Sequence, residues 1–167
     1  MAENNLVRLL EHNNWANLRV LEACESLSDE QLEFQPKSAV HGTIRDTLRH
    51  LVTSQEDYLW MLTKFDHPPE RDTQLTILEL REIALQSGDE LIALVQGSAE
   101  VVLSSRIALN DGYSVDPWVI LTQVINHATE HREQIKSILS SLGVEPPRID
   151  GWLYGRLSNA LIPPASR

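Results

Sequence analysis

Four long segments of this sequence repeat their apolar residues with the period of an α-helix, and no other feature constrains the fold as strongly. The segments span residues 4–26, 43–64, 76–97 and 116–142. In the second of them, for example, Ile44, Leu48 and Leu51 fall on one face. Each apolar face needs another element to cover it, and four such helices cover one another most simply in a four-helix bundle. We therefore predict an all-α fold.

Residues with capping side chains stand at the expected ends of these helices. The expected N-caps are Ser28, Thr43, Thr76, Asp116 and Asp150. Pro117 suits the first position of the last long helix, because the amide hydrogen that proline lacks would be unpaired there. Gly143 is expected to end that helix. The caps at Ser28 and Asp150 also predict two short helices, one before the second long segment and one near the C-terminus.

The segment before the last long helix departs from the helical period. Residues 101–109 are rich in β-forming side chains, and Asn110-Asp111-Gly112 resembles a hairpin turn leading into residues 113–115. We predict a small β-ribbon there. The connections between the long helices are roughly a dozen residues or more, whereas sequential antiparallel helices in bundles usually have shorter loops. This difference favours a topology with a long crossover.

Length and hydropathy indicate a single domain without a membrane anchor. The chain has 167 residues, and we expect one domain over residues 1–167. No stretch approaches the roughly 20 apolar residues that cross a bilayer. The N-terminus lacks the basic and apolar regions of a signal peptide, so we expect a cytoplasmic protein with no membrane partner.

Charge and cysteine content exclude two further classes of protein. The formal net charge is −10 and there is no cluster of Lys and Arg, so we expect no nucleic-acid partner. Cys24 is the single cysteine, which rules out a disulfide within the chain and a cysteine-rich zinc site. Because Cys24 lies among apolar residues, we expect a buried structural thiol.

Two histidines stand four residues apart in the last long segment. His127 and His131 lie one above the other on a helix, with His131 inside the apolar arc and His127 at its edge. Buried imidazoles need polar partners, and one metal ion would satisfy both rings. The pair alone is a weak signal, because two partly exposed histidines have the same spacing. A metal site therefore needs a third ligand.

His50 is the candidate for that third ligand, because no other histidine lies inside a predicted long helix with a plausible inward face. It stands off the centre of the apolar stripe, on a face shared with Ser54 and Asp57, so we expect it to line a cleft between helices. The other histidines are expected at the solvent-facing side of a helix or in loops: His12, His41 and His67.

Polar residues also interrupt two of the apolar stripes. Arg132 falls near the middle of the arc of the last long helix, and Asn14 and Asn17 intrude on the stripe of the first. A buried guanidinium needs a carboxylate or several other acceptors, and the candidates are Asp57, Asp150 and the side-chain carbonyls of the two asparagines. These residues either form a structural polar network or line a cavity near the metal.

Three stretches of the sequence resemble the helices of one known family. INHATEHREQIKSILSSLGVEPPRID is similar to the last bundle helix of the DinB/YfiT-like family, which has a His-x-x-x-His-Arg helix followed by Leu-x-x-Leu-Gly, two prolines and an Asp. TIRDTLRHLVTSQEDYLW resembles the second helix of that family, and NNWANLRVLEA resembles the first. The likeness extends from residue 5 to about residue 154.

The resemblance implies an up-down-down-up four-helix bundle with a long crossover. It also implies one divalent metal ion held by His50, His127 and His131. Nitrogen ligands suit zinc best here, with nickel or iron as alternatives. Three ligands leave coordination positions open, which is the catalytic rather than the structural pattern for zinc.

Three functions fit an open site of this kind. A metal-dependent transferase that activates a small thiol is expected first, because some members of the family resemble thiol S-transferases. The alternatives are a hydrolase that activates water, with Asp57 or the solvent-facing Glu130 as base, and a non-catalytic metal-binding or ligand-binding protein. The expected partner is a small-molecule substrate or thiol, and the chain is compatible with a homodimer.

Overall fold

Four long α-helices make up most of the chain, as the periodicity predicts. They are α1 (Asn5–Cys24), α3 (Ile44–Thr63), α4 (Ile77–Gln96) and α6 (Pro117–Ser141). Their ends fall within two residues of the predicted ones. The computed structural model describes residues 5–37, 42–63, 74–97, 105–109 and 112–162. Over these ranges, none of the helices has the length and apolar character needed to cross a membrane.

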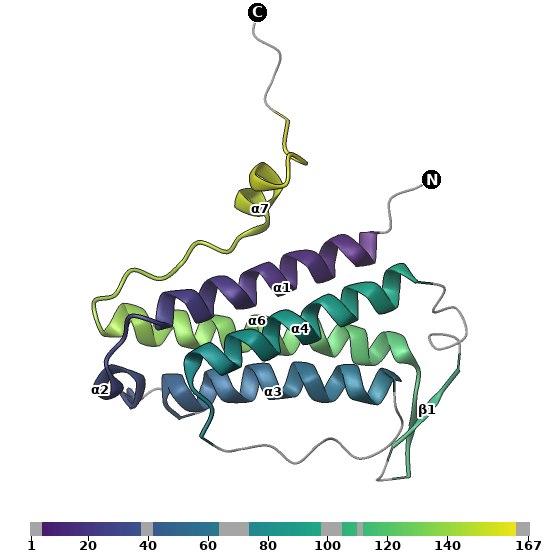
Figure 1. The fold of residues 1–167 in the computed structure, drawn as a ribbon, viewed down its shortest axis with the longest axis horizontal. Helices are drawn as coiled ribbons and strands as arrows, with labels where there is room; N and C mark the ends of the chain where they lie inside the picture. Colours follow the sequence, from purple (N-terminus) through teal and green to yellow (C-terminus); the bar gives the residue numbers. More distant parts are fainter. Residues whose placement is uncertain (1–4, 38–41, 64–73, 98–104, 110–111, 163–167) are drawn as a thin grey trace, which may run out of the picture.

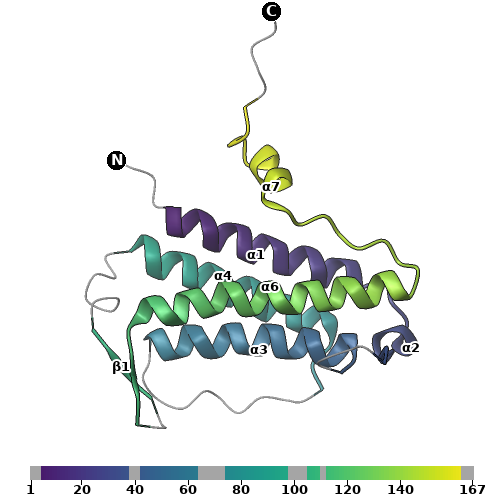
Figure 2. The same ribbon diagram turned by 180° about the vertical axis from the view of Figure 1, so that it is seen from behind.

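The long helices form a bundle in which each packs against two others. α1 packs on α4 and α6, and α3 packs on the same two helices. Figures 1 and 2 show that α1 and α6 run in one direction while α3 and α4 run in the other. The order is therefore up-down-down-up. The parallel helices α3 and α4 are joined by the crossover that the connection lengths favour.

Four shorter elements complete the described fold. They are α2 (Asp29–Leu32), β1 (Ile107–Ala108), β2 (Ser114–Val115) and α7 (Gly151–Leu157). The strands form the predicted antiparallel ribbon before α6, with Ile107 opposite Val115. Gly112 between them has a φ of 89°, a left-handed conformation that glycine adopts without strain. Residues 101–104 of the predicted first strand lie outside the described residues.

Side chains cap the helices at four of the five predicted positions. Ser28 and Thr76 each form a reciprocal capping box with the residue three positions later, and Asp150 accepts a hydrogen bond from a backbone amide of α7. Asp116 is the N-cap residue of α6, as predicted, but its side chain makes no capping hydrogen bond. Its carboxylate instead accepts a hydrogen bond from Nε of Arg106 at 2.9 Å.

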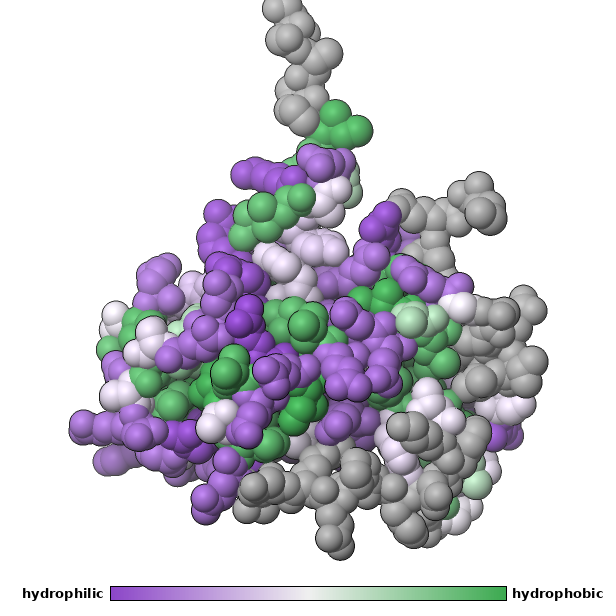
Figure 3. All heavy atoms as spheres, in the orientation of Figure 1, coloured by the Kyte–Doolittle hydropathy of each residue, from purple (hydrophilic) through white to green (hydrophobic). Residues whose placement is uncertain are grey.

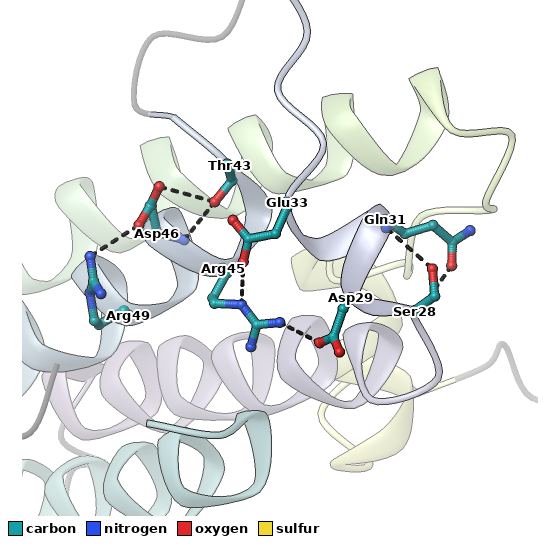
Figure 4. Close-up of polar contacts among 8 residues, drawn as sticks. All are labelled: Ser28, Asp29, Gln31, Glu33, Thr43, Arg45, Asp46 and Arg49. Atoms are coloured by element: carbon teal, nitrogen blue, oxygen red, sulfur yellow. Dashed lines mark hydrogen bonds and ion pairs between the residues drawn. The ribbon is translucent and has the colours of Figure 1, made fainter. Parts of the chain in front are cut away.

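Charged side chains hold the junction between α2 and α3, as Figure 4 shows. Arg45 of α3 donates from Nε to Glu33 at 2.5 Å and from Nη2 to Asp29 at 2.7 Å. Oγ1 of Thr43 accepts a hydrogen bond from the backbone amide of Asp46 at 3.1 Å, which caps α3. Exposed ion pairs of this kind stabilise a fold little, but together with the cap they define where α3 begins.

The interior of the bundle contains two apolar clusters with polar side chains between them. Gln55, for example, lies between Val52 of the first cluster and Leu59 of the second along α3. We use the name polar layer for the following buried side chains: Asn13, Asn14, Asn17, Gln55, Ser87 and Arg132. The layer draws on all four long helices, and every group in it has to find its hydrogen-bond partners without bulk water.

The segment after α6 lies against α1, and its Ile149 is buried in the first apolar cluster. α7 has no buried residue and projects from the bundle in Figures 1 and 3. The hydrophobic residues Leu157 and Ile162 are exposed. His12 donates from Nε2 to the carbonyl oxygen of Ile149 at 2.9 Å, and its ring lies 5.3 Å from that of Tyr154. The prediction that His12 faces solvent is therefore wrong, because the returning chain half-covers it.

Candidate metal centre

Three histidine side chains meet between α3 and α6. These helices lie side by side and antiparallel in Figure 2, with His50 on α3 and His127 and His131 on successive turns of α6. Nε2 of His127 lies 3.1 Å from Nε2 of His50 and 3.0 Å from Nε2 of His131. In the described part of the chain, these three residues form a group whose ligand atoms all lie within 4.8 Å of one another and could hold a metal ion.

The positions of the histidines on their helices explain how deeply each is buried. His131 lies in the apolar arc of α6, one turn from Ala128 and Ile135 of the first cluster, and it is 2% exposed. His127 at the edge of the arc is half-buried, and His50 is exposed, in agreement with its place off the centre of the stripe on α3. The group is therefore closed at His131 and open to solvent at His50.

The second ring nitrogen of two of these histidines faces a side chain on the same helix. Nδ1 of His131 donates to Oε1 of Gln134 at 2.8 Å, because an amide oxygen can only accept. Nδ1 of His50 lies 3.4 Å from Oγ of Ser54, which places this predicted residue beside the site. An imidazole that carries its proton on Nδ1 has a lone pair on Nε2, the atom directed into the group.

The donor set and its spacing fit a divalent metal ion. Nitrogens that bind one zinc ion at about 2.0–2.1 Å lie roughly 3.0–3.4 Å apart, and the two closest Nε2 separations, 3.1 and 3.0 Å, fall in this range. Two nitrogen lone pairs cannot hydrogen-bond to each other, so atoms this close need a proton or a cation between them. Imidazole nitrogens suit zinc, nickel or iron better than magnesium or calcium.

The candidate bases lie outside this group. Asp57 is half-buried on α3 but is not among the residues that could hold the ion. Glu130 is exposed on α6, as expected. The ring of Tyr58, beside Asp57, lies 5.7 Å from that of His127 and forms part of the surroundings of the site. Two histidines lie outside the described residues: His41 and His67.

Arg132 is buried and hydrogen-bonded, as predicted, but its acceptors in the described residues are all uncharged. Nη1 donates to Oδ1 of Asn13 at 2.7 Å and to Oδ1 of Asn17 at 2.6 Å, and Nη2 donates to Oγ1 of Thr129 at 2.9 Å. Asn17 is thus confirmed as a partner, whereas Asp150 caps α7. Burial without a paired carboxylate lowers the pKa of Arg132 to about 10, so the guanidinium remains charged at neutral pH.

The polar layer continues from Arg132 across the bundle. Nδ2 of Asn17 donates to Oε1 of Gln55 at 2.8 Å, and Nε2 of Gln55 donates to Oγ of Ser87, also at 2.8 Å. This chain of hydrogen bonds joins α6, α1, α3 and α4 in turn. Asn17 therefore takes part in a structural network that passes beside the histidines.

Asn14 lies where α1 passes close to α4. Its Nδ2 donates to Oδ1 of Asp89 at 3.2 Å, and a Cβ added to Gly88 would lie 2.1 Å from Oδ1 of Asn14. That oxygen is buried and has no hydrogen-bond partner in the described part of the chain. Asn14 therefore serves the contact between these two helices.

Cys24 is the buried thiol that the sequence predicts. It lies in the first apolar cluster, and burial raises the pKa of its thiol to about 12. The sulfur therefore stays protonated at neutral pH, and Cys24 is not in the group of residues that could hold the metal.

The structure adds residues that the sequence reasoning missed. Gln134 stands three residues after His131, a spacing that places two side chains together on a helix, so a local signal for it was present. Asn13 and Gln55 complete the polar layer. Both sit among apolar residues of their helices, and the same periodicity that singled out Asn14 and Asn17 could have found them.

The protein is an up-down-down-up helical bundle, and the three histidines between α3 and α6 are compatible with a metal site. The DinB family model matches residues 1–162, and the chain belongs to this family, as the sequence motifs imply. The crystal structure of the DinB-like protein YjoA from Bacillus subtilis shares the fold with a TM-score of 0.68 and 15% identity. The match covers 88% of this chain and 99% of that one. No curated protein matches the chain.

Proposed function

We propose that this DinB family protein binds one divalent metal ion through His50, His127 and His131 and is a metal-dependent transferase for a small thiol. The observation that carries the proposal is the convergence of three Nε2 atoms, two pairs of which lie 3.1 and 3.0 Å apart. Zinc is the expected ion, with nickel or iron as alternatives, because imidazole nitrogens favour these metals.

The ligand count leaves room for a molecule from outside the chain. Structural zinc sites use four protein ligands, whereas catalytic sites keep a position open beside three. Cys24 does not supply the missing sulfur, because it is buried elsewhere and protonated. A divalent ion deprotonates a thiol that binds to it, and this is the chemistry that it would supply here.

The histidine group is open to solvent on one side, which supports access for such a thiol. His50 is exposed, so a small molecule reaches the group from this side. The hydrolase alternative uses the same three histidines and differs only in the metal-bound nucleophile, which is water in place of a thiol.

Metal analysis and a thiol titration together test the proposal. Elemental analysis of purified protein should find about one divalent ion per chain, and His127→Ala should lose it. Titration of the cobalt-substituted protein with a small thiol should produce a sulfur-to-cobalt charge-transfer band. Failure of the wild-type protein to bind any divalent ion would overturn the metal site. Metal binding without a thiol-dependent band, together with turnover of activated esters, would favour the hydrolase.

A further inference from the structure

We propose that Gln134 is a positioning residue of the metal centre, which fixes His131 in the tautomer whose Nε2 binds the ion. The inference rests on the proposed metal site and extends it beyond the three histidines. Its basis is the hydrogen bond from Nδ1 of His131 to Oε1 of Gln134 at 2.8 Å.

Burial makes the choice of tautomer at His131 matter. A neutral imidazole carries one proton, on either Nδ1 or Nε2. A proton on Nε2 would leave the lone pair of Nδ1 facing the oxygen of Gln134 at 2.8 Å, two acceptors without a hydrogen between them. A proton on Nε2 would also block that atom as a metal ligand. His131 is 2% exposed, so water does not relieve the clash between Nδ1 and the oxygen of Gln134. The oxygen of Gln134 therefore selects the proton on Nδ1.

The second nitrogen of His50 has a weaker partner. Oγ of Ser54 lies 3.4 Å from Nδ1 of His50, and a hydroxyl can donate as well as accept, so it selects neither tautomer. His50 is also exposed, so water competes for this contact. In the metal centre, the oxygen of Gln134 thus fixes the tautomer of His131, whereas the hydroxyl of Ser54 does not fix that of His50.

Metal affinity provides the first test, by competition with a chromophoric zinc chelator. Gln134→Leu should weaken zinc binding about 10- to 100-fold, the loss seen when the outer partner of a metal-bound histidine is removed. Gln134→Glu keeps an acceptor at the same place and should restore affinity to within a few-fold of wild type. Gln123→Leu, at an exposed position of the same helix, is the matched control and should change nothing.

The second test measures the tautomer itself in metal-free protein. Two-dimensional ¹H–¹⁵N spectra of the imidazoles are recorded at a pH high enough for the rings to be neutral. They should show the proton of His131 on Nδ1 in the wild type. Gln134→Leu should give a mixture of tautomers, and Gln134→Glu should restore the Nδ1 form. A structural role of Gln134 alone would not change this ratio.

The two readouts separate failure of this inference from failure of the proposed function. If wild-type protein binds no zinc, the metal site is wrong, and the tautomer of His131 still tests Gln134. If wild-type protein binds zinc and folded Gln134→Leu binds it equally well, or if wild-type His131 carries its proton on Nε2, the role of Gln134 is overturned.

Discussion

His131 and Arg132 are neighbours on α6, and both are buried, yet their polar atoms find partners in different ways. They are 2% and 4% exposed. Arg132 turns toward α1, where the side-chain oxygens of Asn13 and Asn17 accept its hydrogen bonds. His131 turns toward α3, and its Nε2 lies close to the imidazole nitrogens of His127 on the same helix and of His50 on α3.

The difference separates a structural polar region from a functional one. The guanidinium of Arg132 finds acceptors inside the chain, as buried donors normally do. The three histidines instead direct atoms of the same kind at one another, and a cation is the simplest partner that satisfies all of them. Burial of a polar residue is therefore a weak sign of function, whereas convergence of like groups is a strong one.

The largest effect that we predict is the loss of metal binding when one of the three histidines is replaced. His127→Ala should weaken zinc affinity by more than about 100-fold, because a direct ligand contributes more than the outer partners whose loss costs about 10- to 100-fold. Competition with a chelator measures the change. The unfolding free energy of the metal-free variant should stay close to that of wild type. A variant that keeps wild-type affinity would remove His127 from the site.

The second effect is a loss of folding stability when Arg132 is replaced. Arg132→Met should destabilise the fold by about 2–6 kcal/mol, because the oxygens of Asn13 and Asn17 would each lose a donor at about 1–3 kcal/mol. Denaturant melts of metal-free protein measure the loss. Arg156→Met, which changes an exposed arginine of α7, is the control. A neutral result for Arg132→Met would show that the buried charge costs as much as its hydrogen bonds provide.

The contact between α1 and α4 gives a third, smaller effect. A Cβ at position 88 would lie 2.1 Å from Oδ1 of Asn14, so Gly88→Ala should destabilise the fold by about 1–3 kcal/mol through overpacking. Asn14→Ala in the same chain should recover part of this loss. A double-mutant cycle in denaturant melts measures the coupling. Strictly additive effects would mean that α1 and α4 relax apart without conflict at this point.

The helices and their order could be predicted because the signals for them are local. The spacing of apolar residues and the caps at Ser28, Thr43 and Thr76 depend on residues within one or two turns. Asp116 shows the limit of such signals, because the side chain of an N-cap residue can form an ion pair in place of the capping hydrogen bond. Here the partner is Arg106. His12 shows another, because the segment that covers it lies 137 residues further along the chain.

The candidate site could be predicted in part for the same reason. The spacing of His127 and His131 on one helix makes them candidates directly. His50 is a candidate from its place in a second helix, but it lies off the centre of its stripe, and the family resemblance was needed to strengthen its assignment. The acceptors of Arg132 include Asn17, 115 residues away, and only the packing of α1 on α6 decides that an amide rather than a carboxylate meets it. The periodicity of apolar residues therefore does not predict which side chains of different helices contact one another.

Metal removal should affect the molecule less than these substitutions do. The two apolar clusters hold the bundle without an ion, so a chelator should leave helical circular dichroism at room temperature unchanged. The melting temperature should fall, because a ligand that binds the folded state alone stabilises it. Loss of helix on adding the chelator would show instead that the site is structural, as in domains that unfold without their metal.

The smallest effect should come from Cys24, which decides whether the metal site is open. Cys24→Ser should leave zinc affinity unchanged, because the thiol is buried in an apolar cluster, with a pKa raised to about 12, and lies outside the histidine group. Alkylating reagents should accordingly react with it slowly in folded protein and quickly after unfolding. Cobalt-substituted wild type and Cys24→Ser should both show sulfur charge transfer only after a small thiol is added. A band present in wild type without added thiol, and absent from Cys24→Ser, would mean that the chain closes its own site. The transferase would then have no position left for its substrate.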